Sequence, residues 1–228
     1  MTDTDAVVRS FYGRWSAIYD RLATLPPASS WRARTAEALR LGPGETVVEM
    51  GCGTGANLHH LRQQVGPGGR VLGLDLTAGM LQRARTVGRE PGGLVQADAT
   101  RPQLDGDLDA ILGTFVVGLF AEPAAVVAEW CDQVGPGGRV GLLHFHASDR
   151  RFAAPVNALY RALVRVSSPS GARAAGAAAH HDARVRQAED ALAARASSCT
   201  TKCFAGGFLR LTVGQIGADD TGETNCNE

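Results

Sequence analysis

A glycine-rich turn between an apolar strand and a helix is the part of the sequence best suited to binding a ligand. The segment VVEMGCGTGANL (47–58) places Gly51, Gly53 and Gly55 directly after the apolar residues. Glycine is favoured there because a Cβ would block positive φ and hold the backbone away from a ligand. The dinucleotide fingerprint needs glycine at position 56, which is Ala56, and no Gly-Lys-Ser/Thr follows. The turn therefore indicates a cofactor loop without naming the cofactor.

Two aspartates near the ends of later strands could hold a nucleoside. Asp75 ends VLGLD, where its carboxylate could accept both ribose hydroxyls; alternatively it caps the helix that follows. Asp98, in Gln-Ala-Asp-Ala, could accept an adenine amino group, or it is a loop aspartate in solvent. Met80 is expected either to lie against the adenine ring or to pack in the core. Together these residues favour a nucleoside cofactor.

Two histidines could remove a proton from a substrate. His144 and His146 lie at the end of an apolar run and, being two apart, point to the same side of a strand. A histidine near its unperturbed pKa suits proton removal; the alternative is that they cap the strand end or bind loop carbonyls. The pairs 59–60 and 180–181 fall on helices and are expected at the surface. No carboxylate has a spacing that would complete a metal site, so we predict no metal.

The elements that must position these residues alternate between strand and helix. Apolar runs separated by helical segments repeat five times between residues 45 and 146, a pattern typical of a mostly parallel sheet with helices on both faces. Ligands bind such sheets at the carboxyl ends of the strands. Helical patterns follow at 152–166 and 172–196, and TTKCF and FLRLTVGQI would pair as an antiparallel hairpin. The sequence thus predicts an α/β fold.

The composition limits the kinds of partner that the chain is expected to bind. The chain has 228 residues with Lys+Arg and Asp+Glu at 23 each, so no overall charge attracts nucleic acid or an anionic membrane. Its five cysteines form no CxxC pair, which argues against a zinc site or a disulfide framework and favours a reducing cytoplasm. The amino terminus is polar and acidic, unlike a signal peptide. We expect a cytoplasmic protein with a small-molecule partner, no integral membrane segment and, at most, peripheral membrane contact.

Over residues 45–145 the chain resembles class I S-adenosylmethionine (SAM)-dependent methyltransferases: VEMGCGTG matches their first motif, Asp75 their acidic residue and Gln-Ala-Asp-Ala their third motif. The segments FYGRWSAIYDRL and AGGFLRLTVG are similar to the ends of the ubiquinone/menaquinone biosynthesis C-methyltransferases, whose relatives include bacterial phospholipid N-methyltransferases. Those quinone enzymes carry Gly-Leu-Arg-Asn after the fourth strand, where this chain has GTFVVG (113–118). This departure counts against a quinone precursor as substrate.

The resemblance implies a Rossmann-like, doubly wound, mostly parallel seven-stranded sheet with a C-terminal antiparallel hairpin and an N-terminal helical lid. It implies that the loop glycines line the methionine portion of SAM, with Asp75 at the ribose and Asp98 and Ala99 at the adenine. Glu49 stands next to the amino acid portion, or bonds the loop backbone, and Tyr19 is a lid contact or packs on Trp15. The predicted cofactor contacts are Tyr19, Glu49, Gly51, Cys52, Gly53, Gly55, Asp75, Leu76, Met80, Asp98, Ala99 and Thr114.

The function implied is transfer of the SAM methyl group to a small-molecule acceptor, such as a quinone precursor or a lipid-like compound. The predicted organisation is a helical lid at 1–40, a SAM-binding domain at 41–217 with a helical substrate insertion at 150–196, and a polar tail at 218–228. Two alternatives stay open: a SAM-binding protein without catalysis, and an NAD(P)-dependent oxidoreductase. The oligomeric state, the acceptor and the methylated atom are not specified by these patterns.

Overall fold

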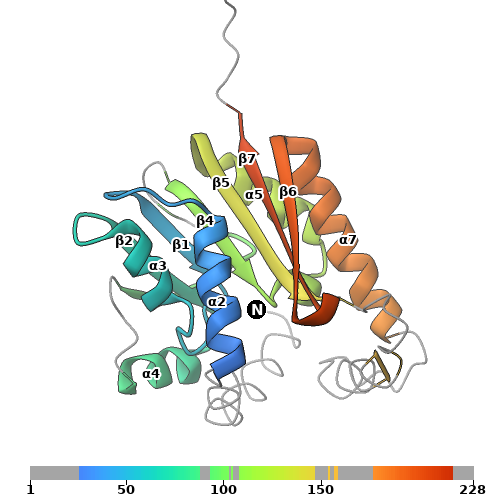
Figure 1. Cartoon of the computed structure of the whole chain (residues 1–228), viewed down its shortest axis with the longest axis horizontal. Helices are drawn as coiled ribbons and strands as arrows, with labels where there is room; N and C mark the ends of the chain where they lie inside the picture. The colour runs from blue at the N-terminus through green and yellow to red at the C-terminus, as the bar shows by residue number, and fades with distance from the viewer. Residues whose placement is uncertain are drawn as a thin grey trace, which may run out of the picture.

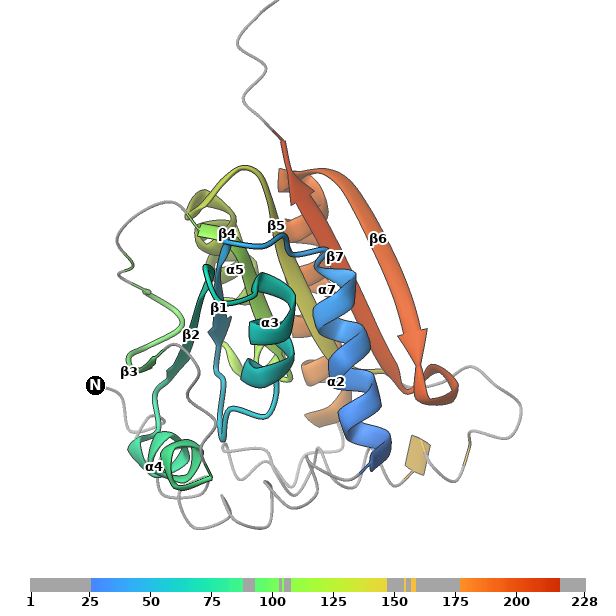
Figure 2. The same ribbon diagram turned by 60° about the vertical axis from the view of Figure 1, so that its left-hand side comes forward.

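A single seven-stranded sheet organises the computed structural model, which describes residues 26–87, 93–102, 104, 108–146, 154, 157–158 and 177–217. The strand order is β3-β2-β1-β4-β5-β7-β6. The strands are β1 (Thr46–Met50), β2 (Arg70–Asp75), β3 (Leu94–Gln96), β4 (Leu108–Thr114), β5 (Val134–Phe145), β6 (Ala196–Phe204) and β7 (Leu209–Ile216). Helices cover both faces of this sheet (Figures 1 and 2). The predicted α/β class and strand number are confirmed.

Strands β1 to β5 run parallel, and β7 enters antiparallel between β5 and β6. The central strands β1 and β4 are buried almost throughout, as expected for parallel strands covered on both faces. Their carboxyl ends therefore meet at one edge of the sheet, where Met50, Asp75 and Thr114 end β1, β2 and β4. The predicted C-terminal hairpin is confirmed, with β6 pairing along β7 from Ala196 to Phe204.

Helices α2 (Pro26–Ala38), α3 (Leu58–Val65) and α4 (Ala78–Thr86) supply one apolar layer. Leu39 beside α2, Leu61 of α3 and Leu81 of α4 are buried there against Val47 and Leu112 of the sheet. Helix α2 begins at Pro26 and so includes two prolines in its first turn. Proline lacks an N–H, but the first helical turn leaves its N–H groups without intrahelical partners, so proline is tolerated there.

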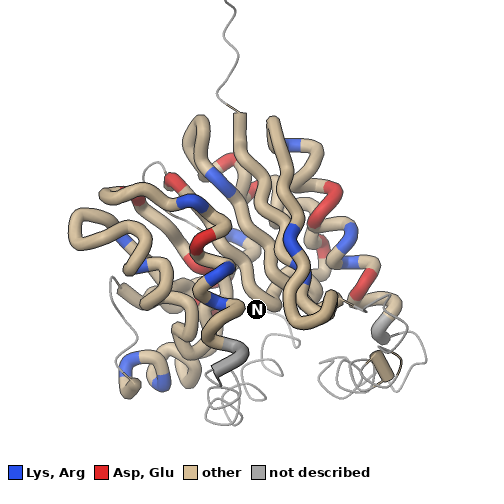
Figure 3. Tube along the Cα trace, in the orientation of Figure 1, with Lys and Arg blue, Asp and Glu red and all other residues tan. Residues whose placement is uncertain are grey.

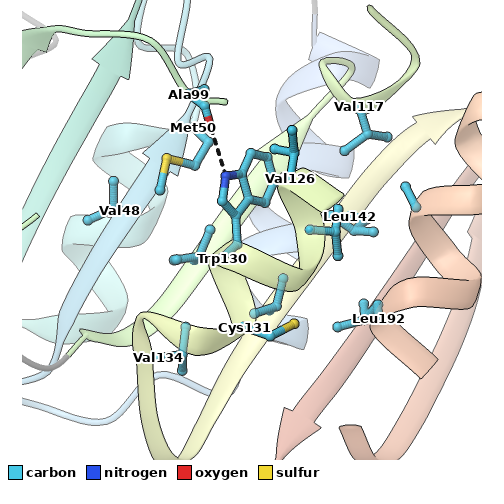
Figure 4. Packing of buried hydrophobic residues seen from close by; sticks show 14 of the residues in the cluster. Val48, Met50, Ala99, Val117, Val126, Trp130, Cys131, Val134, Leu142 and Leu192 are labelled. Carbon is cyan, nitrogen blue, oxygen red and sulfur yellow. Dashed lines mark hydrogen bonds between the residues drawn. The ribbon is translucent and has the colours of Figure 1, made fainter. Parts of the chain in front are cut away.

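Helices α5 (Pro123–Asp132) and α7 (Ala177–Arg195) cover the opposite face. Trp130 is fully buried between Met50 and Leu142, and its indole Nε1 donates a 2.8 Å hydrogen bond to the carbonyl of Ala99 (Figure 4). Leu192 of α7 belongs to the same cluster. Segment 177–195, which the sequence assigns to a substrate insertion, therefore also closes the core over β5 and β7.

Basic and acidic positions are interspersed along the described chain (Figure 3). No helix among the described residues is long and apolar enough to cross a membrane. Residues 1–25 of the predicted 1–40 lid, most of the predicted 152–166 helix and the predicted tail from 218 lie outside the described residues.

Candidate active site

The loop after β1 has the backbone geometry that its glycines predict. Gly51, Gly53 and Gly55 have φ values of 68°, 55° and 73°, all in the left-handed region that side chains disfavour. A Cβ on Gly51 would also lie 2.8 Å from Cγ2 of Val116. The loop is thus confined against the segment that follows β4, and only glycine permits this close approach.

A buried polar network lies beneath this loop. Glu49, on β1, is completely buried, and its Oε1 accepts hydrogen bonds from the Asn57 side-chain amide and from Thr114 Oγ1, the latter at 2.9 Å. Asn57 also receives a 2.8 Å hydrogen bond on Oδ1 from Nη1 of Arg32 on α2. The network joins α2, β1, the loop and β4 at the carboxyl edge of the sheet.

The Glu49 carboxyl group has a raised pKa. Burial raises its pKa from 4.5 to about 7, against the opposing effects of the Asn57 bond, the Arg32 charge and the Thr114 bond. Its second oxygen, Oε2, has no hydrogen-bond partner among the described residues. A cationic ligand group at Oε2 would stabilise the ionised form of Glu49, because the attraction between two paired charges offsets the cost of burying them away from water.

Asp75 links β2 to the glycine loop. Its Oδ2 accepts a 2.8 Å hydrogen bond from the Gly53 backbone N–H, and its Oδ1 accepts one of 2.8 Å from the Thr77 N–H. Burial raises the pKa of this carboxyl, while the two backbone donors oppose the shift. Each carboxylate oxygen can accept a further hydrogen bond. Asp75 therefore holds the loop and retains acceptor capacity.

The other predicted cofactor contacts differ in their surroundings. Asp98 is exposed, and its Oδ1 accepts from the N–H and hydroxyl of Thr100, both at 2.8 Å. Met80 is buried. Cys52 is buried in the α2–α3 core, so its side chain packs beneath the loop, while its backbone N–H bonds the carbonyl of Leu74 at 2.9 Å. Leu76, directly after Asp75, is half-buried, and Tyr19 lies outside the described residues.

A second polar cluster lies between β5, β7 and α7. His144 is 2% exposed, and neither ring nitrogen has a hydrogen-bond partner among the described residues. Its Nε2 is 3.7 Å from Oε1 of Glu189, a distance too long for a hydrogen bond. The same oxygen accepts from the Thr212 hydroxyl at 2.6 Å and lies 3.1 Å from Nε of Arg210.

Burial, followed by the charge of Arg210, lowers the pKa of His144 to about 3. The ring is therefore neutral at physiological pH, when it can donate one hydrogen bond and accept another. A pKa this low makes it a weak proton acceptor. His146, just beyond β5, is half-buried, and its N–H bonds the carbonyl of Phe208 at 2.9 Å.

Two helix histidines expected at the surface are covered, one almost fully and the other in part. His60 is only 8% exposed, and burial lowers its pKa to about 4. His181 is half-buried, and a Cβ on Gly118 would lie 2.3 Å from its Nε2. The prediction was wrong for these two because helical periodicity does not show which turns another element covers. It holds for His59 and His180, which are exposed.

Arg32 and Asn57 were missed as site residues by the sequence interpretation. Asn57 precedes an apolar helix, where asparagine usually reads as a cap, although its side chain makes no cap bond here. Arg32 precedes Glu49 by 17 residues, and no local pattern connects them. Among the described residues, no group of three His, Cys, Asp or Glu side chains could hold a metal ion.

The chain matches known methyltransferases in sequence and in fold. Residues 48–142 match the family model described as a methyltransferase domain. The chain is 34% identical over 175 residues to the phosphatidylethanolamine N-methyltransferase of Cereibacter sphaeroides, covering 74% of this chain and 81% of that protein. It is 31% identical over 144 residues to the demethylmenaquinone methyltransferase of Clavibacter sepedonicus, covering 60% and 58%. Two other curated relatives are aligned over only 36% and 49% of their length.

Among solved structures, a SAM-dependent methyltransferase from Aquifex aeolicus superposes with a TM-score of 0.60 at 17% identity, covering 88% of this chain and 98% of that one. This likeness supports the fold alone. The chain belongs to the class I SAM-dependent methyltransferases. The predicted family and its cofactor, SAM, are thereby confirmed, and the NAD(P)-dependent oxidoreductase alternative is set aside.

Proposed function

We propose that this protein transfers the SAM methyl group to a small-molecule acceptor at the carboxyl edge of the sheet. The observation that carries the proposal is the Glu49 carboxylate, which is buried beneath the glycine loop with one oxygen partnered and the other without a described partner. A fully buried carboxyl oxygen without a partner is costly. The ammonium group of a SAM amino acid portion has the charge and the donors that would satisfy it.

The remaining residues fit the other parts of that cofactor. Asp75 has acceptor capacity left for the ribose hydroxyls, although both of its oxygens already hold backbone N–H groups. Asp98 is exposed with Oδ2 not engaged by Thr100, so it can accept an adenine amino group. The positive φ angles of the loop glycines allow backbone to approach the methionine portion. The proposed contacts of Leu76, Met80, Ala99, Thr114 and Tyr19 stay predictions.

When bound, SAM supplies a methyl group already activated on a sulfonium. The protein's own contribution is then to hold the acceptor in line and to exclude water. The neutral His144 ring can hydrogen-bond an acceptor hydroxyl or amine, but its low pKa makes it a poor base unless a substrate changes its surroundings. His146, half-buried at the strand end, stays the second candidate.

The acceptor is proposed to be a quinone precursor or a lipid-like compound. Relatives named for phosphatidylethanolamine and for demethylmenaquinone support these two classes, while the GTFVVG segment departs from the quinone enzymes. A cytoplasmic location, peripheral membrane contact and the domain bounds also stay predictions.

Calorimetry with S-adenosylhomocysteine (SAH) and with NAD(P)H tests the cofactor assignment, and SAH alone should bind. Turnover with labelled SAM against quinol, phenol, lipid and amine acceptors then separates an enzyme from a SAM-binding protein without catalysis. A protein that binds SAH and methylates none of these classes would support the non-catalytic alternative.

A further inference from the structure

Phe115, the first residue after β4, has a strained backbone. Its φ is +58°, in the left-handed region that bulky side chains rarely adopt. Its N–H donates a 2.7 Å hydrogen bond to the carbonyl of Leu143 on β5, which fixes the turn. Glycine or asparagine would adopt this conformation with less strain. Such outliers gather at ligand sites, so the aromatic side chain needs an explanation.

The ring of Phe115 stacks on a second aromatic ring at the end of the neighbouring strand. The centroids of Phe115 and Phe145 are 4.6 Å apart, and the ring planes are tilted by 30°. Phe115 also packs against the buried cluster formed by Leu143, Phe204, Leu209 and Leu211, together with Trp31 of α2. The cluster therefore supports the Phe115 ring of the pair.

One ring of the pair is exposed at the carboxyl edge of the sheet, and the other is half-buried. Phe145 is 42% exposed, although large apolar side chains are usually covered. Phe115 follows Thr114, whose hydroxyl bonds Glu49 at 2.9 Å. Among the described residues, the other large exposed apolar side chains are Leu119, shortly after β4, and Val95, on β3 at the other end of the sheet. Phe115 thus stands at the carboxyl edge of the sheet, one residue after a member of the Glu49 network.

We propose that Phe115 and Phe145 form a platform on which a planar aromatic ring of the acceptor stacks. This inference rests on the proposed function and narrows its acceptor to a ring compound in place of an acyl-chain lipid. A further aromatic ring can meet the open face or edge of such a pair in an offset or edge contact. The strained backbone of Phe115 has a function on this proposal, because it places an aromatic ring directly after Thr114 at the carboxyl edge of the sheet.

The test measures binding of 2-naphthol, a bicyclic phenol, to the SAH-loaded protein by calorimetry. Wild type should bind it, whereas Phe115→Gly and Phe145→Ala should each weaken binding at least fivefold with SAH affinity unchanged. Phe115→Gly should not lower the melting temperature by the amount expected for a lost core aromatic, because it relieves the positive φ. Val95→Ala, which removes an equally exposed apolar side chain on β3, is the matched control and should change neither affinity.

Phe115→Asn and Phe145→Leu are a second pair of variants for the same binding test, because asparagine tolerates positive φ and leucine keeps apolar volume. Naphthol binding that is absent in wild type, or unchanged in both phenylalanine variants, would overturn the platform. The platform would also be overturned if the protein fails to bind naphthol but sediments with phosphatidylethanolamine vesicles in a way that depends on Phe145. That result would indicate a lipid acceptor. Failure of SAH to bind would instead contradict the proposed cofactor, and naphthol binding can be measured without SAH to separate the two failures.

Discussion

Two buried polar groups at the carboxyl edge of the sheet have contrasting surroundings. Glu49, at the β1 end, is held by hydrogen bonds from Asn57 and Thr114, and only one of its oxygens lacks a described partner. His144, at the β5 end, is equally buried, yet neither ring nitrogen has a hydrogen bond among the described residues. Hydrogen bonds thus fix the Glu49 side chain at the β1 end, whereas no described hydrogen bond fixes His144 at the β5 end. This contrast fits a fold that keeps its cofactor and varies its substrate.

The largest effect should come from Glu49→Gln. Losing a buried charge opposite the cofactor ammonium should weaken SAM binding about a hundredfold, consistent with roughly 3 kcal/mol for a buried ion pair. The free protein should be stabilised at the same time, because the charge no longer has to be buried. Calorimetry and thermal melting of the same samples measure both effects. Tight SAM binding by this variant would remove Glu49 from the site.

The stability effect of Glu49 has a definite pH dependence. Its pKa rises from 4.5 to about 7 on folding, so the folded state favours the protonated form. This contribution is present below pH 4.5 and is lost as the pH rises towards 7, a difference of about 3 kcal/mol. Glu49→Gln should therefore gain more in melting temperature at pH 8 than at pH 5. An equal gain at both values would contradict the raised pKa.

SAM affinity should depend on the same carboxyl. On the proposed role of Glu49, its ionised form pairs with the cofactor ammonium, so affinity should fall as the pH drops below about 7, approaching tenfold per pH unit. Calorimetry between pH 5.5 and 8 gives the profile, and Glu49→Gln should flatten it. A wild-type profile as flat as that of the variant would show that another group controls binding.

Asp75→Ala should lower SAM affinity by about tenfold or more, on the order of one lost pair of charge-assisted hydrogen bonds. The variant also removes the acceptor for the Gly53 and Thr77 N–H groups, so the loop should become more mobile. Asp98→Ala, with its exposed carboxylate, should cost less. Unchanged affinity in Asp75→Ala would refute its role at the ribose.

The smallest effect on cofactor affinity should come from replacing the histidines at the β5 end. Replacing both His144 and His146 by alanine should change SAH affinity less than twofold while turnover falls. His144→Leu should be tolerated or stabilising, because it removes buried polar atoms that have no described partner. Turnover assays and melting curves distinguish these outcomes. Retained activity in the double variant would leave both histidines with a structural role. A large loss of SAH affinity would show that the β5 end also binds the cofactor and would contradict the contrast with Glu49.

The region around Glu49 was easier to predict from the sequence than the region around His144, because the residues that shape its loop lie close together in the chain. Gly51, Gly53 and Gly55 adopt the positive φ angles that their spacing indicates, and alternating apolar runs gave the parallel sheet. Asn57 and Arg32 were missed because they reach Glu49 only through the folded arrangement of α2 and the loop. The burial of His60 and His181 was missed for the same reason: tertiary contacts decide which face of an amphipathic helix is covered. The strain at Phe115 has no sequence signal, since phenylalanine ordinarily argues against positive φ.

Titration of the wild-type protein with SAH and, separately, with NADH in a calorimeter at pH 8 tests the central claim most directly. A SAM site built around Glu49 and Asp75 predicts tight one-to-one SAH binding that Glu49→Gln weakens about a hundredfold, the size of effect expected for a buried charge pair, and no binding of NADH. Binding of NADH without SAH, or SAH binding that is indifferent to Glu49, would contradict it.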